Sequence, residues 1–488
     1  MTATGQATGL RGGDASVVIA GLTADSRAVR PGYLFAALPG ARADGRAFIA
    51  DAVARGAAAV LAPEGTAWPP AVPPRPMIED ADPRRRLALM AAAFHGAQPR
   101  TIAAITGTNG KTSTADFLRQ IWAALHEGRA ASLGTLGLVA PGHEAGPGLT
   151  TPDPVALAAT LASLARLGID HAAIEASSHG LDQRRLDGVR LAAGAFATFT
   201  RDHLDYHGTM GAYLDAKLRL FEALLPEGAP AVAQTAMPDE ALARLRAICA
   251  RRHLRLHTVG PGGEAMAVEA AMPRADGQAI TLSRAGRRRE ILLPLIGFQG
   301  ANALTAAMLA IATGADEEAV FAILPRLAGV RGRIERVAVL GNGAAVYVDY
   351  AHTPDAIGTV LAALRPHVAG RLAIVVGAGG DRDPGKRPLM GEAAARGADR
   401  VTITDDNPRS EDPALLRAAV LAGARGVSPE AWEIGGREEA IGAAVAALGP
   451  GDVLVVAGKG HEQGQEIAGR TIPFDDATVA RAAAARRA

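Results

Sequence analysis

The sequence predicts an α/β protein in which helices cover mainly parallel sheets and which is divided into three domains. Short apolar runs alternate with Ala- and Leu-rich stretches, as in TIAAIT followed by STADFLRQIWAALHE, and this alternation from end to end is the pattern of βα units. A chain of 488 residues also exceeds what one hydrophobic core supports. Gly- and Arg-containing stretches near 96–100 and 329–333 mark the boundaries, so the predicted domains are 1–97, 98–332 and 333–488.

Charge balance and cysteine content narrow the class of function. Lys and Arg number 51 against 50 Asp and Glu, so the net charge is +1, and no basic field favours a nucleic acid or an anionic membrane. Small molecules are therefore the expected partners. The one cysteine, Cys249, lies in a helix-like run and is interpreted as a buried, inert thiol. No signal-peptide pattern and no apolar run of about 18 residues is present, so a cytoplasmic protein is expected.

Two segments of the first domain are predicted to lie at the protein surface. The Pro-rich stretch Trp68–Pro76 cannot continue a helix or a central strand, so it is predicted to be a loop. The arginine cluster Arg84–Arg86 is interpreted as solvated, because nothing glycine-rich accompanies it.

A glycine-rich turn lies between an apolar strand and a helix in TIAAITGTNGKTSTADFLRQIW. Backbone N–H groups of such a turn, together with the start of the helix, bind phosphates. Lys111 is placed to reach the β- and γ-phosphates, and the Thr112 hydroxyl to bind Mg²⁺. The leading glycine is Gly107, so the loop is shorter than the general pattern G-x-x-x-x-G-K-[ST]. A plain turn with a chance Gly-Lys-Thr remains the alternative to a phosphate site.

The run HAAIEASSHGL predicts a buried strand that ends at Glu175. An acidic group at the carboxyl edge of a parallel sheet is a candidate Mg²⁺ ligand beside the phosphate loop. The following Ser177, Ser178 and His179 give the alternative, a polar loop that caps the next helix.

His203 and His207 lie four residues apart in FATFTRDHLDYHGTMGAYLDAKLRLF, a spacing found in zinc peptidases. Leu204 stands where that chemistry requires a glutamate, so we reject a zinc pair. His203 is interpreted as a ligand or an orienting donor near a Mg-bound phosphate. Lys217 lies in the helical run YLDAKLRLF, where the sequence alone favours a solvated lysine.

In the C-terminal third, charged loops follow three predicted strands. RLAIVVGAGGDRDPGKRPLM carries Arg382 in place of the third glycine of G-x-G-x-x-G, which disfavours a dinucleotide site. The strands VTITDD and VLVVAGKGHEQG bring Asp406, Arg409 and Glu462 to the same sheet edge. This mixture of charges suits a zwitterionic ligand with ammonium and carboxylate groups. A solvated rim of loops is the alternative.

An ordered set of motifs runs along nearly the whole chain: TGTNGKTST, EASSHGL, TRDHLDYHGTM, VDYAHTPDA, GGDRDPGKRPLM, TDDNPRSEDP and AGKGHE. Together they closely resemble the Mur ligases of peptidoglycan synthesis. The resemblance implies a smaller N-terminal α/β domain that binds a UDP-sugar, a central P-loop ATPase-type parallel sheet that binds ATP, and a C-terminal Rossmann-like domain that binds an amino acid. It implies a cytoplasmic ligase of cell-wall biogenesis, cell shape and cell division, expected to be a monomer.

The resemblance also implies the reaction. ATP would phosphorylate the γ-carboxylate of a D-glutamyl residue in a UDP-N-acetylmuramoyl dipeptide. An amine of meso-diaminopimelate would then attack the acyl phosphate, and an amide and inorganic phosphate would result. Catalysis would proceed chiefly by positioning and electrostatics.

Individual residues match functional positions of the family. Lys217 is expected to carry a carbamate made from CO₂, which would make it an anionic ligand of Mg²⁺ beside Thr112, Glu175 and His203. The implied catalytic residues are Lys111, Lys217, His203 and Glu175. Implied ATP contacts are Gly107, Thr108, Asn109, Gly110, Lys111, Thr112, Ser113, Asn302, Arg333 and Asp349. Implied UDP-sugar-dipeptide contacts are Ala24, Ser26, Ala41, Arg42, Ala43, Thr150, Thr151, Ser177, Gln183 and Arg185. Implied diaminopimelate contacts are Arg382, Asp406, Asn407, Pro408, Arg409, Gly458 and Glu462.

The resemblance implies that the motif Asp406-Asn407-Pro408-Arg409 selects the incoming amino acid, and its form here is the one that the family associates with meso-diaminopimelate. Diaminopimelate has a second carboxylate that lysine lacks, and an arginine fork can bind it through two hydrogen bonds. Such a charge-assisted contact contributes roughly 1.5–3 kcal/mol. The alternatives are a related ligase for lysine or a dipeptide, a folate polyglutamylating relative, a phosphate-loop kinase and a nucleotide-gated binding module.

Overall fold

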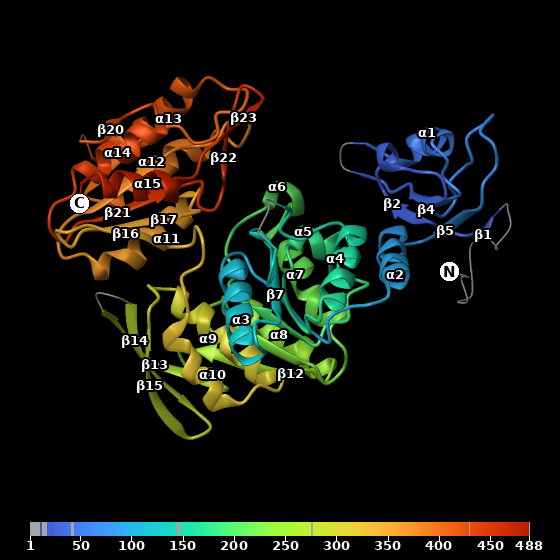
Figure 1. Ribbon diagram of the computed structural model, residues 1–488, viewed down its shortest axis with the longest axis horizontal. Coiled ribbons are helices and arrows are strands. Elements are labelled where there is room, and N and C mark those ends of the chain that lie inside the picture. Colours follow the sequence, from blue (N-terminus) through green and yellow to red (C-terminus); the bar gives the residue numbers. More distant parts are fainter. Residues whose placement is uncertain are drawn as a thin grey trace. The chain divides into compact units, whose positions relative to one another are not determined.

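The computed structural model describes residues 10–11, 17–40, 43–143, 148–274, 277–428 and 430–487. The chain forms two compact units. Figure 1 labels the helices and strands and colours them along the sequence. The first unit contains Met1–Thr258 and Met308–Ala315, and the second contains Val259–Ala307 and Asp316–Ala488. Within the described ranges, no helix is both long and apolar enough to span a bilayer.

The first unit begins with a small sheet in the strand order β1-β5-β4-β3-β2. Its strands are parallel except for β1, which is antiparallel to β5. The strands are β1 (Leu10–Arg11), β2 (Gly21–Thr23), β3 (Tyr33–Ala36), β4 (Ala59–Pro63) and β5 (Met77–Asp80), and the helices are α1 (Ile49–Ala54) and α2 (Pro83–His95). Buried Leu, Val and Ala of β3 and β4 form its core. The Pro-rich stretch Trp68–Pro76 forms neither helix nor strand, which confirms the predicted loop.

Six strands of the first unit lie in the order β11-β10-β6-β9-β7-β8 within a ten-stranded sheet, and among these six only β8 is antiparallel. The strands are β6 (Thr101–Thr106), β7 (Ala130–Gly134), β8 (Gly137–Val139), β9 (His171–Glu175), β10 (Ala193–Phe196) and β11 (Pro230–Gln234). The helices are α3 (Lys111–Leu125), α4 (Pro154–Arg166), α5 (Ser178–Asp182), α6 (Leu204–His207), α7 (Met210–Arg219) and α8 (Asp239–Arg251). The strand TIAAIT and the helix after it are confirmed. Cys249 is buried in α8, where burial raises the pKa of its thiol to about 11.

The expected alternation of strands and helices is wrong for residues 266–293. After β12 (Arg255–Gly260), an antiparallel meander in the second unit contains β13 (Met266–Arg274), β14 (Gly277–Arg284) and β15 (Arg287–Leu293). Exposed residues dominate β13 and recur along β15. Antiparallel strands tolerate a solvated face, whereas parallel strands are usually covered on both faces. Helices α9 (Gln299–Ala312) and α10 (Glu317–Ile323) follow.

The C-terminal sheet has the strand order β16-β17-β21-β18-β19-β20, with β16 antiparallel and the others parallel. The strands are β16 (Glu335–Val339), β17 (Ala345–Asp349), β18 (Leu372–Val376), β19 (Arg400–Ile403), β20 (Trp432–Glu433) and β21 (Val453–Ala457), followed by a hairpin of β22 (Gly464–Ile467) and β23 (Arg470–Pro473). The helices are α11 (Pro354–Leu364), α12 (Lys386–Gly397), α13 (Pro413–Arg425), α14 (Arg437–Ala446) and α15 (Asp476–Ala485). Since β21, β18 and β19 are neighbours and parallel, the loops after them meet at one edge.

Candidate functional site

The predicted phosphate loop connects the end of β6 to α3. Gly107 has φ 148° and Gly110 has φ 85°, conformations that glycine adopts without strain. A Cβ on Gly107 would lie 3.0 Å from the backbone nitrogen of Thr198, so the loop packs closely on its neighbour. The Thr108 N–H donates to Thr198 O at 2.7 Å, and the Asn109 N–H donates to Thr198 Oγ1 at 3.0 Å. The remaining expected contacts, Lys111, Thr112 and Ser113, form the first turn of α3.

Two lysine side chains meet at one carbonyl of this loop. Lys111 Nζ donates to Gly107 O at 2.7 Å and to Thr108 O at 2.8 Å. Lys217 Nζ donates to the same Gly107 O at 2.8 Å and lies 4.3 Å from the centre of the Tyr213 ring. Lys217 is 1 % exposed, so the solvated lysine favoured by the sequence alone is wrong. Burial first, and the Lys111 charge second, lowers the pKa of Lys217 well below its ordinary value.

Glu175 ends β9 beside β6, as predicted, and its side chain is buried. Its Oε1 accepts the Thr135 N–H at 2.8 Å, and its Oε2 accepts the Thr135 hydroxyl at 3.2 Å. A Cβ on Gly134 would lie 2.0 Å from Glu175 Oε1. The carboxylate therefore has a fixed position on the sheet edge that carries the phosphate loop, and only a glycine at 134 leaves room for it.

The other candidate metal ligands lie on separate elements of the first unit. Thr112 is buried at the start of α3, and His203 precedes α6 in a left-handed conformation with φ 50°. The His203 ring lies 4.9 Å from the His179 ring, and burial lowers the pKa of His203, which favours the neutral, metal-binding form. Within the ranges that the structure describes, no group of three or more His, Cys, Asp and Glu could hold a metal. The set with Glu175 and Lys217 stays a prediction.

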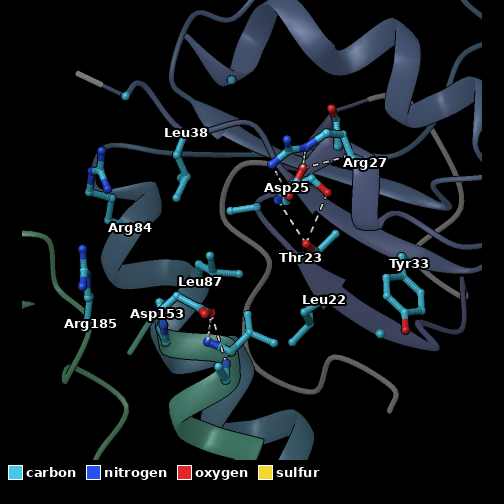
Figure 2. Close-up of a pocket in the computed structure, with 18 of the residues that line it drawn as sticks. Leu22, Thr23, Asp25, Arg27, Tyr33, Leu38, Arg84, Leu87, Asp153 and Arg185 are labelled. Carbon is cyan, nitrogen blue, oxygen red and sulfur yellow. Dashed lines mark hydrogen bonds and ion pairs between the residues drawn. The ribbon is translucent and has the colours of Figure 1, made fainter. Parts of the chain in front are cut away.

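A pocket of about 1390 Å³ opens in the first unit, lined by parts of the N-terminal sheet, α2 and α4 (Figure 2). The expected nucleotide-sugar contacts that line it are Ala24, Ser26, Ala43, Gln183 and Arg185. The expected contacts Ala41 and Arg42 lie outside the described residues. Arg84 also lines the pocket, and Figure 2 shows it on the same side as Arg185. Two guanidinium groups on one wall suit an anionic ligand such as a diphosphate.

Threonine side chains link this pocket to Glu175. Arg185 Nη1 donates to Thr151 O at 2.6 Å, and Thr151 Oγ1 donates to Glu175 O at 2.7 Å. The Thr150 hydroxyl lies 3.2 Å from that of Thr135, which itself donates to the Glu175 carboxylate. The expected sugar-dipeptide and metal positions are therefore joined by one hydrogen-bonded network.

Ser177 and Gln183 flank the short helix α5. Ser177 Oγ accepts the Gly180 N–H at 3.0 Å, so the helix-capping role that the sequence offered as an alternative is present. Gln183 Oε1 accepts from Arg185 Nη2 at 2.8 Å, and Gln183 Nε2 donates to Tyr206 OH at 3.2 Å. These bonds fix the amide orientation of Gln183 on the pocket wall.

Two expected ATP contacts of the second unit, Asn302 and Arg333, are joined by hydrogen bonds through Gln299. Asn302 Nδ2 donates to Gln299 Oε1 at 3.0 Å, and Gln299 Nε2 donates to Arg333 O at 2.9 Å. Asp349 accepts two backbone N–H groups at 2.7 and 2.8 Å. Burial raises the pKa of Asp349 to about 6, against the opposing effect of Arg333.

Arg409 follows β19 in a left-handed conformation with φ 53°. Its N–H donates to Glu466 O at 2.9 Å, its Nε to Glu466 Oε2 at 3.1 Å and its Nη1 to Gly380 O at 2.7 Å. The side chain is 21 % exposed, so it lies between two loops rather than in solvent. Among the described residues its Nη2 has no hydrogen-bond partner, which leaves part of the fork for a carboxylate.

The other residues expected to bind the amino acid lie on the loops at the same edge. Residues 406–408 are buried, and Arg382 is exposed after β18. Gly458 has φ 116°, and a Cβ there would lie 2.5 Å from Asp406 Oδ2. Glu462 Oε2 accepts from Asn407 Nδ2 at 2.9 Å. Both signs of charge are present, as the sequence predicted.

Sequence reasoning did not mark several residues that lie in these sites. They are Thr135 on Glu175, Tyr213 on Lys217, and Lys459 beneath the loops of the C-terminal sheet. Arg84, which the sequence led us to interpret as solvated, lines the pocket. For Lys459 a signal existed, because it lies between two glycines directly after an apolar strand.

Three family models match the chain. The model of the Mur ligase family catalytic domain matches residues 18–95, that of the Mur ligase middle domain matches residues 105–310, and that of the Mur ligase glutamate ligase domain matches residues 332–460.

Curated relatives and solved structures are similar over nearly the full chain. A protein of Rhizobium meliloti named UDP-N-acetylmuramoyl-L-alanyl-D-glutamate--2,6-diaminopimelate ligase is 52% identical over 96% of this chain and 94% of its own. A protein of the same name from Caulobacter vibrioides is 53% identical over 94% of each. A solved structure of that name has TM-score 0.69 at 33% identity, covering 96% of this chain and 95% of that chain. The MurF ligase of Thermotoga maritima in complex with ADP has TM-score 0.60 at 19% identity, covering 91% of this chain and 94% of that chain, and supports the fold alone.

Proposed function

Because the chain belongs to the Mur ligase family, we propose that it joins meso-2,6-diaminopimelate to the γ-carboxylate of D-glutamate in UDP-N-acetylmuramoyl-L-alanyl-D-glutamate. The ligation depends on ATP and supplies a peptidoglycan precursor. The observation that carries this function is the 52% identity, over 96% of the chain, to a relative whose name states that reaction.

The proposed reaction has two steps. A γ-carboxylate oxygen of the D-glutamyl residue attacks the γ-phosphorus of ATP, and ADP leaves with the electrons of the broken P–O bond. The neutral amine of diaminopimelate then attacks the acyl carbon, loses a proton, and displaces inorganic phosphate. The loop of residues 107–113 binds the phosphates through its N–H groups, and Lys111 offsets the charge on the transferred phosphoryl group.

A Mg²⁺ site is proposed at Thr112, Glu175, His203 and Lys217. The hydroxyl of Thr112 and the ordered carboxylate of Glu175 are the oxygen donors that Mg²⁺ prefers. When bound, the ion neutralises charge on the phosphates. Lys217 fits this site only as a carbamate, formed when its neutral amine adds to CO₂ and loses a proton, and its lowered pKa supports that chemistry.

The substrates are proposed to bind at the sites described above. UDP-N-acetylmuramoyl dipeptide occupies the pocket of the first unit, with its phosphates near Arg84 and Arg185 and its peptide directed along Thr150 and Thr151 toward Glu175. Asn302, Arg333 and Asp349 contact the nucleotide. Diaminopimelate occupies the loops after β18, β19 and β21, where Arg409 binds its second carboxylate.

Each of the three predicted domains is proposed to bind one substrate. We propose residues 1–97 for the UDP-sugar, 98–332 for ATP and 333–488 for the amino acid. The protein is proposed to act in the cytoplasm as a monomer on small molecules, and its net charge of +1 supports the exclusion of nucleic acid and anionic membrane as partners.

Phosphate release tests the function. The purified protein is expected to release phosphate from ATP only when UDP-N-acetylmuramoyl-L-alanyl-D-glutamate and diaminopimelate are both present, because the amine displaces phosphate from the acyl phosphate in the second step. The assay measures phosphate for each amino acid of a panel that includes L-lysine and D-alanyl-D-alanine. Equal turnover with lysine would contradict the selector assignment. Accumulation of a stable phosphorylated sugar dipeptide over many turnovers without any amine would instead indicate a phosphate-loop kinase.

A further inference from the structure

A lysine without an assigned role is fully buried beneath the amino-acid loops. Lys459, in the loop after β21, is 0% exposed. A buried ammonium is costly unless charged or polar groups bind it. Its Nζ donates to Asn407 Oδ1 at 2.9 Å and to Glu462 Oε2 at 2.8 Å. Both partners are residues proposed above to bind diaminopimelate.

The ammonium group of Lys459 fixes the orientation of the Asn407 amide. An ammonium only donates, so the amide oxygen of Asn407 must face it. The same Oδ1 accepts the Glu466 N–H at 2.9 Å. The amide nitrogen is thereby directed to the Glu462 carboxylate, to which it donates at 2.9 Å.

The two carboxylate oxygens of Glu462 differ in their hydrogen bonds. Its Oε2 accepts from both Lys459 Nζ and Asn407 Nδ2. Its Oε1 accepts no hydrogen bond from any residue that the structure describes, and the side chain is 31% exposed. The carboxylate therefore has one anchored oxygen and one that is available to an ammonium group of a ligand.

We propose that Lys459 is a positioning residue for the amino-acid substrate, which orients Asn407 and keeps Glu462 ionised with Oε1 directed to the substrate ammonium. The inference rests on the proposed function, because it assigns a specificity role within the same site. Lys459 itself does not touch the substrate. It acts through Asn407 and Glu462, the two side chains that contact the substrate.

Three titratable groups besides Lys459 interact with Glu462, and none of the three offers it an unpaired positive charge. His461 of the same loop, Arg437 of α14 and Tyr350 after β17 also interact with Glu462. Burial lowers the pKa of His461 to about 4, so its ring is neutral in ordinary assays. Arg437 is paired with buried Asp476 through two bonds of 2.7 Å.

Burial alone would raise the pKa of Glu462, but Lys459, by its charge and its hydrogen bond, holds it below the usual value. The ionised form is the one that accepts an ammonium. Ionisation of Glu462 in the free enzyme contributes to the acid limb of kcat/KM for diaminopimelate, together with loss of a proton from the attacking amine. Without the Lys459 charge the pKa rises, so that limb moves to higher pH.

The experiment compares the full-length wild type with Lys459→Met, Lys459→Gln and Lys459→Arg. Loss of the charge in the Met and Gln variants is expected to move the acid limb of kcat/KM for diaminopimelate upward by about one pH unit or more. The KM for diaminopimelate is expected to rise roughly tenfold at neutral pH, while the KM for ATP stays unchanged. Lys459→Arg retains a cation and is expected to keep the acid limb near the wild-type position.

The outcomes separate the inference from the proposed function. If the wild type does not turn over diaminopimelate, the proposed function fails. If the wild type turns over but Lys459→Gln has the wild-type acid limb and diaminopimelate KM, Lys459 has no positioning role. An equal rise of both KM values, with no change of the pH profile, would mean that Lys459 only supports the fold. Lys459→Gln keeps hydrogen-bonding groups in the buried site. Its KM values and pH profile therefore distinguish these outcomes even if Lys459→Met does not fold.

Discussion

Replacement of Lys217 by alanine is expected to lower kcat by roughly 10²–10³-fold, the scale of losing one electrostatic stabiliser of a transition state. In the proposed state the Lys217 carbamate is an anionic Mg²⁺ ligand beside the phosphate loop, and alanine removes it. The side chain is buried over the Tyr213 ring and bonded to Gly107 O, so the loss also leaves a cavity at the site. The measurement is steady-state kcat with all three substrates.

Chemical rescue distinguishes a carbamate from a structural lysine. Formate or acetate is expected to restore part of the activity of Lys217→Ala, because a short carboxylate fits the cavity and replaces the anionic ligand. Lys217→Met is the matched control, since its side chain fills the cavity and is expected to prevent rescue. Unchanged activity of Lys217→Ala would refute a catalytic role for Lys217.

Replacement of Arg409 by alanine is expected to raise the KM for diaminopimelate roughly ten- to a hundredfold, the equivalent of about 1.5–3 kcal/mol for a charge-assisted contact. The guanidinium is held by Gly380 O and Glu466, which orients the rest of its fork. The KM for ATP is expected to stay unchanged, and the preference for diaminopimelate over lysine is expected to fall by the same factor. The measurement is the pair of kcat/KM values for the two amino acids.

Two further variants test whether the effect is specific to the guanidinium of Arg409. Arg409→Lys keeps the charge without the planar fork, so an intermediate KM is expected. Arg396→Ala removes an exposed arginine of α12 that, among the residues that the structure describes, pairs only with Glu392. This variant is expected to leave both KM values unchanged. A wild-type diaminopimelate KM in Arg409→Ala would overturn the selector role.

Local patterns predicted the elements that carry the chemistry. The strand TIAAIT, the glycine-rich turn and the helix from Lys111 are adjacent in the chain, so their arrangement follows from turn geometry and helix capping. Glu175 at the end of β9 was predictable for the same reason, because an apolar run that ends in an acid places that acid at a sheet edge.

Burial and long-range contacts were less predictable. Lys217 lies on a helix as expected, but its burial depends on packing against the phosphate loop, about a hundred residues earlier in the chain. The pocket combines Ser26 and Arg84 with Arg185, which only tertiary folding brings together. The β13–β15 meander was missed because its exposed face gives weak apolar runs.

In the proposed reaction, ATP activates the substrate carboxylate as an acyl phosphate before the amine attacks. Oxygen-isotope transfer tests this most directly, with ¹⁸O in both γ-carboxylate oxygens of the D-glutamyl residue and mass analysis of the released phosphate. The proposed reaction predicts one ¹⁸O atom in each phosphate, because the attacking carboxylate oxygen leaves with phosphorus, and one in the amide product. Released phosphate that contains no ¹⁸O from the labelled carboxylate would contradict the acyl phosphate step.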